Sequence, residues 1–173
     1  MVTEKEIQDQ KRLSAVCGLF CPSCTLFIGT KEDPQRLKAF SERYQLPVEA
    51  WECEGCRSEK RSYYCENLCQ MVACAADKGI EFCGECVEYP CDELKKFQAE
   101  RPHRIELWES QERIAKIGFS GWFEEMVEHY SCPNCRTINS TYDKACRACG
   151  TEPSCRYVQL HKGDIEEYLS KSK

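Results

Sequence analysis

Cys132-Pro133-Asn134-Cys135 is followed, after ten residues, by Cys146-Arg147-Ala148-Cys149-Gly150. Each Cys-x-x-Cys turn holds two sulfurs close enough to bind one metal ion, and a hairpin between two such turns completes a tetrahedral set of four sulfurs. A glycine directly after the last cysteine suits the positive φ of a tight turn. We therefore predict that residues 131–173 form a β zinc ribbon with a short C-terminal helix.

The other cysteines extend this signal toward the N-terminus. The chain has 173 residues and 16 cysteines, of which eleven lie between Cys17 and Cys91 and five between Cys132 and Cys155. This distribution predicts three parts: a Cys-rich metal-binding domain over residues 12–98, connecting helices over 99–130, and the ribbon over 131–173. The expected fold class is therefore α+β, with a helix-rich Cys-rich domain, connecting helices and a C-terminal β zinc ribbon.

The N-terminus indicates the compartment and therefore the state of the thiols. Residues 1–12 contain no apolar segment or cleavage site typical of a secretory signal, and no apolar run approaches the ~18 residues that span a bilayer. We therefore expect a soluble, cytoplasmic protein without a membrane association. Because disulfides are rare in a reducing compartment, the thiols are interpreted as metal ligands.

Fifteen cysteines are predicted metal ligands: Cys132, Cys135, Cys146, Cys149, Cys17, Cys21, Cys24, Cys53, Cys56, Cys65, Cys69, Cys74, Cys83, Cys86 and Cys91. In the N-terminal array, Cys65 and Cys69 are four residues apart on a predicted helix and can reach one ion. One hypothesis joins them to the 53/56 pair and joins the 21/24 pair to the 83/86 pair. Cys17, Cys74 and Cys91 are then spare, or they replace members of these sets.

The N-terminal array also resembles a known family. Cys17-Gly18-Leu19-Phe20-Cys21-Pro22-Ser23-Cys24, the Cys-Glu-Gly-Cys segment at 53–56, Cys65, Cys69, Cys74 and the segment from Lys78 to Cys91 are similar to a cysteine-rich prokaryotic domain family of unknown function. The resemblance covers residues 14–98, and some members continue into a ribbon like that at 132–149. It implies a metal-binding protein, with zinc as the expected metal, and it supplies no reaction.

Helix signals fill the segments between the cysteines. The Asp33-Pro34 pair predicts a helix that ends near Tyr44, and Gly79 closes a predicted helix over 63–78. Further helices are predicted over 104–117, closing at Gly118, and over 120–130. Asp164 and Glu167 resemble a capping box for the final helix, and residues 136–139 and 156–160 are the candidate strands.

An apolar stripe precedes the ribbon and is the candidate surface for a protein partner. It contains Trp108, Phe119, Trp122, Phe123, Met126, Val127 and Tyr130. The simpler reading is that the stripe packs against the Cys-rich domain and joins the two metal modules. If part of it stays exposed, residues 108–130 become a docking surface for a protein partner.

Sequence motifs for catalysis or for an organic cofactor are absent. Cys17-x3-Cys21-x2-Cys24 has the spacing of a radical S-adenosylmethionine loop, but the repeated βα units of a barrel are missing. Phosphate-binding, zincin and nucleophile-elbow motifs are also missing, and His103, His129 and His161 are isolated. No Cys-x-x-Cys turn begins a helix in a thioredoxin-like pattern.

Together these observations favour a zinc-binding protein that acts as an interaction or regulatory module, and an enzyme is disfavoured. An iron–sulfur protein with a redox or sensing role is one alternative, because soft thiolates suit both metals. A zinc ribbon that binds nucleic acid is another. It is weakened by the net charge of −5 and by the lack of an Arg/Lys cluster.

Overall fold

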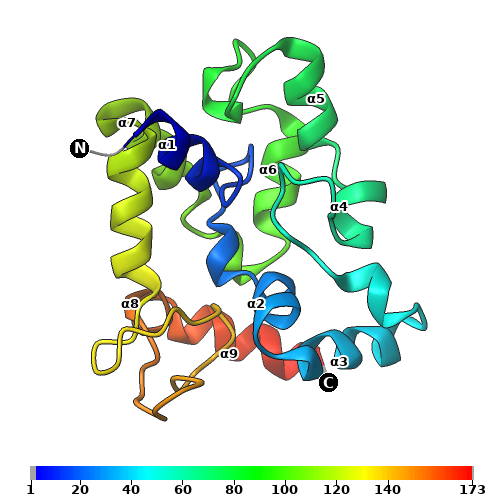
Figure 1. Cartoon of the computed structure of the whole chain (residues 1–173), viewed down its shortest axis with the longest axis vertical. Helices are drawn as coiled ribbons and strands as arrows, with labels where there is room; N and C mark the ends of the chain where they lie inside the picture. The colour runs from blue at the N-terminus through cyan, green and yellow to red at the C-terminus, as the bar shows by residue number, and fades with distance from the viewer. Residues whose placement is uncertain (1–2, 173) are drawn as a thin grey trace.

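The chain folds as a set of helices joined by long loops, and the computed structural model describes residues 3–172 (Figure 1). The α-helices are α1 (Glu4–Lys11), α2 (Thr25–Lys31), α3 (Pro34–Tyr44), α4 (Tyr63–Asn67), α5 (Met71–Lys78), α6 (Asp92–Ala99), α7 (Leu107–Tyr130), α8 (Arg156–Leu160) and α9 (Lys162–Lys171). Short 3-10 turns are η1 (Cys21–Ser23), η2 (Val48–Trp51), η3 (Cys83–Glu85) and η4 (Pro102–Arg104). None of these helices combines the length and the apolar character needed to cross a bilayer.

The predicted β zinc ribbon is wrong, and with it the α+β class. Across residues 3–172 there is no strand or sheet, only two isolated bridges, Ser14–Phe20 and Ser131–Ile138. The candidate strand at 136–139 fails because Arg136 has a positive φ of 63°, which extended backbone does not allow. The candidate strand at 156–160 is helix α8, which buries Tyr157 and Val158.

The predicted helices are found with altered boundaries. Helix α3 begins with Pro34 at its first position and ends at Tyr44, as predicted, and the following Gln45 has left-handed backbone. The helix predicted over 63–78 is divided into α4 and α5. The two helices predicted around Gly118 form the single span of α7, in which Gly118 breaks the helical backbone with φ 77° and ψ 166°. Helix α9 starts at Lys162, so Asp164 is not its cap.

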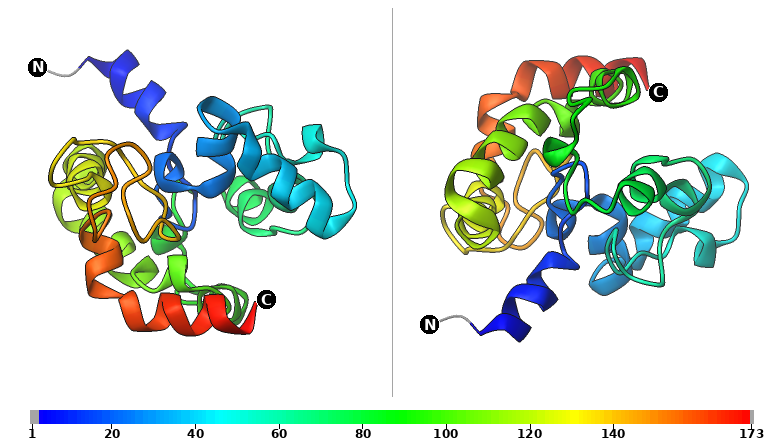
Figure 2. Two further views of the ribbon diagram at one scale, coloured as in Figure 1. Left: turned by 90° about the horizontal axis from the view of Figure 1, so that it is seen from below. Right: turned by 90° about the horizontal axis from the view of Figure 1, so that it is seen from above.

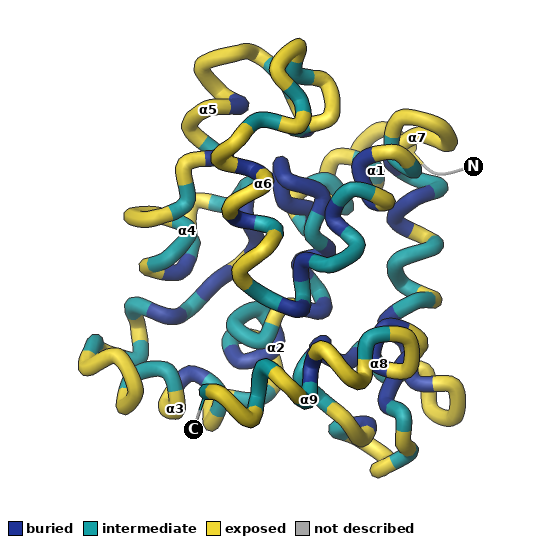
Figure 3. Tube along the Cα trace, turned by 180° about the vertical axis from the view of Figure 1, so that it is seen from behind, coloured by how far each residue is buried: buried dark blue, intermediate teal, exposed yellow. Residues whose placement is uncertain are grey.

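Two apolar clusters hold these elements together. The N-terminal core contains Ala15, Val16, Cys17, Cys21, Cys56, Met71, Ala75, Leu94, Phe97 and Leu107. The C-terminal core contains Phe20, Phe82, Phe119, Trp122, Phe123, Tyr130, Cys155, Tyr157, Val158 and Ile165. Figure 3 shows buried stretches gathered between α6 and α7, whereas exposed residues predominate on α5 and the loop beyond it.

The apolar stripe of α7 is the centre of the C-terminal core. Trp122 is fully buried, and its ring lies 6.3 Å from that of Phe20. Phe82 stacks on Phe119 at 6.0 Å. Because Phe20 and Phe82 belong to the Cys-rich segment, α7 joins that segment to the C-terminal loops. The stripe is therefore largely core.

A half-buried carboxylate connects both ends of α7 to the C-terminal helices. Glu106 precedes the helix, and its two oxygens lie 2.7 Å from His129 Nε2 and 2.7 Å from His161 Nε2. Burial raises the pKa of Glu106, but the nearby imidazoles of His129 and His161 outweigh burial, and the pKa is lowered. His129 stands near the end of α7 and His161 stands between α8 and α9, so one residue connects three elements.

Figures 1 and 2 show the resulting arrangement. Helix α7 lies on one side of the molecule and helices α3 and α4 on the other, with α2 between them. The loops over residues 131–155 lie beside α8, at the C-terminal end of α7. This arrangement brings the C-terminal cysteines close to α2 and α3.

Candidate metal centre

The first of the two C-terminal cysteine turns is closed by a pair of backbone hydrogen bonds. The Cys132 N–H donates to the Thr137 carbonyl at 2.8 Å, and the Arg136 N–H donates to the Cys132 carbonyl at 3.0 Å. Arg136 takes the left-handed backbone that closes the turn. Thr137 Oγ1 lies 3.3 Å from Cys135 Sγ. These bonds fix the two cysteines of the turn in one orientation.

The second turn repeats this geometry. The Cys146 N–H donates to the Thr151 carbonyl at 2.8 Å, and the Gly150 N–H donates to the Cys146 carbonyl at 2.8 Å. Gly150 has a φ of 75°, which confirms the positive φ predicted for it. Thr151 Oγ1 lies 3.2 Å from Cys149 Sγ. The segments Cys-Pro-Asn-Cys-Arg-Thr and Cys-Arg-Ala-Cys-Gly-Thr are thus two copies of one turn.

The two turns face each other and bring four sulfurs together. The Sγ atoms of Cys132, Cys135, Cys146 and Cys149, which we call the C-terminal four-cysteine cluster, all lie within 4.8 Å of one another. The distance is 3.6 Å from Cys132 to Cys149 and 3.6 Å from Cys135 to Cys146. A tetrahedral zinc ion with Zn–S bonds of about 2.3 Å requires sulfurs about 3.8 Å apart. The cluster could therefore hold a metal ion.

Amide groups donate to the sulfurs of the cluster. The Asn134 N–H lies 3.4 Å from Cys132 Sγ, and Asn134 Nδ2 lies 3.6 Å from Cys149 Sγ. The Thr151 hydroxyl and N–H, together with the Asn134 side chain, lower the pKa of Cys149 to about 5. Burial raises the pKa of Cys146, but N–H groups of the turn outweigh it, and the pKa is lowered. Thiolate is the form that binds a metal.

Asn139 joins the two turns from the inside. Its side chain is fully buried. Nδ2 donates to the Thr137 carbonyl at 2.9 Å and to the Ser154 carbonyl at 3.2 Å, and it lies 3.6 Å from Cys146 Sγ. Oδ1 accepts from the Arg147 N–H at 3.0 Å. Sequence reasoning missed Asn139, because neither spacing nor composition marks a buried amide.

The cluster is anchored to the N-terminal helices by polar contacts. Arg147 Nη1 lies 2.7 Å from Glu32, directly after α2, and Arg36 of α3 lies 2.9 Å from Asp143. The hydroxyls of Thr25 and Ser140 are 2.8 Å apart. The C-terminal loops therefore dock on α2 and α3 through side chains and not through a sheet.

The sixteenth cysteine, Cys155, lies outside the cluster. It is buried in the C-terminal core, and Ser154 Oγ donates to its sulfur at 3.8 Å. Burial raises its pKa. Cys155 is a packing residue and provides a control for the four cysteines of the cluster.

The eleven N-terminal cysteines differ in exposure. Cys17, Cys21, Cys53 and Cys56 are buried, Cys65, Cys69, Cys83, Cys86 and Cys91 are partly exposed, and Cys24 and Cys74 are exposed. Within residues 3–172, the C-terminal four-cysteine cluster is the only group of three or more potential ligands with all ligand atoms inside 4.8 Å. The predicted partition of the N-terminal cysteines into metal sites stays a prediction.

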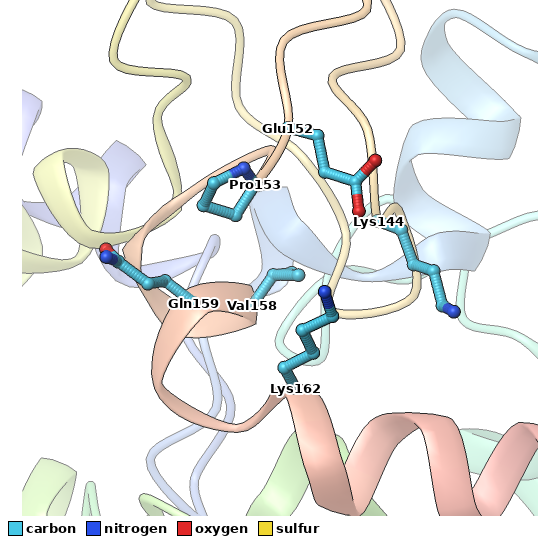
Figure 4. Close-up of a pocket in the computed structure, with 6 residues that line it drawn as sticks. All are labelled: Lys144, Glu152, Pro153, Val158, Gln159 and Lys162. Carbon is cyan, nitrogen blue, oxygen red and sulfur yellow. The ribbon is translucent and has the colours of Figure 1, made fainter.

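A surface cavity lies near the cluster but lacks catalytic chemistry. It has a volume of about 380 Å³ and is lined by Lys144, Glu152, Pro153, Val158, Gln159 and Lys162 (Figure 4). The Lys144 ammonium is paired with Glu166 at 2.8 Å. The lining holds no nucleophile paired with a base, as acid–base catalysis requires.

Comparison with known families agrees with the cysteine pattern. Residues 13–96 match the sequence model of a family described as "Protein of unknown function (DUF3795)". Neither the curated proteins nor the solved structures include a significant match. The match and the four-cysteine cluster fit a cysteine-rich domain of unknown function, as the resemblance implied.

Proposed function

We propose that this chain, with its cysteine-rich domain of unknown function, is a zinc-binding protein that acts as an interaction or regulatory module. One zinc ion is bound by Cys132, Cys135, Cys146 and Cys149. The observation that carries the proposal is the spacing of the four sulfurs, all within 4.8 Å, on two turns of identical hydrogen bonding.

The sulfur spacing favours one ion over a cluster of several irons. A [4Fe–4S] or [2Fe–2S] centre places its irons and bridging sulfides between the cysteines, so its ligands must be farther apart than those of a single ion. The close pairs of 3.6 Å match a mononuclear site. Zinc is the expected ion, because structural sites made of four cysteines are typically tetrahedral zinc sites.

A zinc ion here has a structural role. Residues 132–155 contain no helix or strand, so turn and loop hydrogen bonds hold this region without a helix or a sheet ladder. A structural zinc ion contributes on the order of 10 kcal/mol to small folds of this type. Four protein ligands also leave no open coordination position, which a catalytic zinc requires. We therefore place the function in binding and not in catalysis.

The contacts of the arginines disfavour the nucleic-acid alternative. Arg136 is paired with Glu128, and Arg147 is paired with Glu32 at 2.7 Å. Both arginines lie on the cysteine turns, where a nucleic-acid-binding zinc module would present them to phosphate. Because each faces a carboxylate, the surface around the cluster offers little free positive charge.

Elemental analysis of three proteins tests the proposal. Wild type and the Cys155→Ser control should contain the same amount of zinc, and Cys149→Ser should lose one equivalent per chain. All three should be colourless. Equal zinc in Cys149→Ser and wild type would refute the site, and a brown protein absorbing near ~400 nm would establish the iron–sulfur alternative instead.

A further inference from the structure

The four cysteines of the C-terminal four-cysteine cluster differ in their exposure to solvent. Cys132 and Cys146, the first cysteines of the two turns, are 0% and 4% exposed, whereas Cys135 and Cys149, the second cysteines, are exposed. Oxidation of a cysteine depends on its thiolate character and on its exposure, and a metal-bound cysteine is a thiolate. An oxidant in solution therefore reaches the second cysteine of each turn.

Each exposed sulfur lies beside a buried sulfur of the opposite turn. Cys149 Sγ is 3.6 Å from Cys132 Sγ, and Cys135 Sγ is 3.6 Å from Cys146 Sγ. A disulfide has an S–S bond of about 2.0 Å, so a small side-chain rotation brings either pair to bonding distance. Each pair thus combines a sulfur that solvent reaches with a sulfur that can complete a disulfide from inside.

Contacts that do not involve the sulfurs hold the two turns face to face. Asn139 Nδ2 donates to the carbonyls of Thr137 and Ser154, and its Oδ1 accepts from the Arg147 N–H inside the second turn. Because none of these groups is a proposed metal ligand, the bonds do not depend on a metal ion. The sulfurs of the two turns therefore remain opposite one another when the ion leaves.

A threonine hydroxyl lies next to each exposed sulfur. Thr137 Oγ1 is 3.3 Å from Cys135 Sγ, and Thr151 Oγ1 is 3.2 Å from Cys149 Sγ. A hydroxyl at this distance can donate a hydrogen bond to a peroxide that approaches the sulfur. Such a bond stabilises the negative charge that develops on the departing oxygen.

We propose that the C-terminal four-cysteine cluster is an oxidation site for hydroperoxides. Oxidation forms two disulfides between the turns, Cys132–Cys149 and Cys135–Cys146, and releases the metal ion. The release rests on the proposed zinc site, whereas the pairing rests on the positions of the sulfurs. The zinc content of the protein, and with it the regulatory role proposed above, then depends on the supply of oxidant.

The reaction takes two electrons from each pair of thiolates. With hydrogen peroxide, the exposed thiolate attacks one oxygen, the O–O bond breaks, and the sulfur becomes a sulfenic acid while hydroxide leaves. The buried thiolate attacks the sulfenic sulfur, so that the S–S bond forms and the S–O bond breaks with loss of a second hydroxide. Two solvent protons convert both hydroxides to water. Two peroxide molecules thus oxidise four thiolates, and the zinc ion leaves as Zn²⁺.

Disulfide mapping of the intact wild type tests the pairing. The zinc-loaded protein is treated with hydrogen peroxide, its free thiols are blocked, and it is digested with trypsin without a reductant. Cleavage after Lys116, Arg136, Lys144, Arg147 and Arg156 leaves the first two cysteines on peptide 117–136 and the other two on peptides 145–147 and 148–156.

We expect mass spectrometry to find peptide 117–136 linked to both of the other peptides. Fragmentation should assign the links as Cys132–Cys149 and Cys135–Cys146, and a chromogenic chelator should detect the loss of one zinc equivalent as they form. Disulfides within the turns would overturn the proposal. They would appear as an internal link in 117–136 and a link between 145–147 and 148–156.

Two variants check the assignment of the sulfurs. Cys155 shares peptide 148–156 with Cys149, so Cys155→Ser should give the same two links as wild type. Cys149→Ser should form the Cys135–Cys146 link alone and leave Cys132 as a free thiol. A link to Cys155 in wild type, or loss of both links in Cys155→Ser, would contradict the pairing.

The outcomes separate this inference from the proposed function. If the wild type contains no zinc, the proposed function fails, and mapping of the metal-free protein still decides the pairing. If the wild type contains zinc and keeps both the ion and its four free thiols in excess peroxide, the oxidation site does not exist and the proposed zinc site stands.

Discussion

Arg147 and Glu32 are 115 positions apart in the chain, and Nη1 of the arginine lies 2.7 Å from Oε2 of the glutamate. Arg147 stands inside the second cysteine turn, and Glu32 directly follows α2. The same guanidinium donates through Nε to the Ile138 carbonyl at 2.9 Å. One side chain therefore links the C-terminal four-cysteine cluster to the N-terminal helices.

Arg147→Ala should destabilise the protein more than Glu32→Gln. The alanine variant removes both the ion pair and the bond to the Ile138 carbonyl, and we expect a loss of about 1–2 kcal/mol. The Glu32 side chain is 57% exposed, and an exposed ion pair contributes about 0–1 kcal/mol. Urea unfolding of the two variants at equal zinc content measures the difference. A larger loss in Glu32→Gln would contradict this account of the docking.

Substitutions at the residues that close the two cysteine turns should change the melting temperature in opposite directions. Gly150 has a φ of 75°, so Gly150→Ala introduces left-handed strain of about 1 kcal/mol and should lower the melting temperature. Arg136 has a φ of 63°, so Arg136→Gly should relieve strain. The ion pair with Glu128 that is also lost is more than half exposed and contributes about 0–1 kcal/mol, so the melting temperature should still rise. Calorimetry of both variants checks the shared geometry. Shifts of the same sign in both would show that the turns are not equivalent.

Glu106→Gln should reduce stability in a pH-dependent way. The pKa of Glu106 is lowered in the folded protein, so its contribution is present above the unfolded pKa of about 4.3 and is lost as the pH falls through the folded pKa. We expect the variant to be about 1–2 kcal/mol less stable than wild type at pH 7. The difference should shrink toward zero below pH ~4.

The control for this prediction is Glu112→Gln, which changes an exposed glutamate on α7. Denaturation of wild type and both variants across the pH range gives the difference directly, since acid-induced loss of the proposed metal ion would affect all three alike. A constant difference for Glu106→Gln at every pH would show that shape, and not charge, holds His129 and His161 in place.

Sequence motifs of a few residues correctly predicted the cysteine cluster, the start of α3 and the turn at Gly150. The four cysteines of the C-terminal four-cysteine cluster come together because each pair is fixed by its own turn. Helix α3 begins at Pro34 because proline favours the first helical position. The positive φ at Gly150 follows from the same kind of reasoning.

Features that depend on tertiary contacts were missed or wrongly assigned. Thr137 and Ile138 favour a strand by composition, but the closing bond of the turn places Arg136 in left-handed backbone. No sheet hydrogen bonds connect the two turns. Instead, the Asn139 side chain donates to two carbonyls and a sulfur. The helix over 156–160 forms because its apolar side chains pack under α7. Sequence periodicity over five residues cannot report such packing.

The most direct test of the central claim is X-ray absorption spectroscopy at the zinc edge, applied to the purified wild type and to Cys149→Ser. The four-cysteine site predicts a shell of four sulfurs at about 2.3 Å in wild type, and loss of one zinc equivalent in Cys149→Ser. Three results would contradict the assignment of Cys132, Cys135, Cys146 and Cys149 as a zinc site. These are a wild type without zinc, a first shell that contains nitrogen or oxygen, and an unchanged signal in Cys149→Ser.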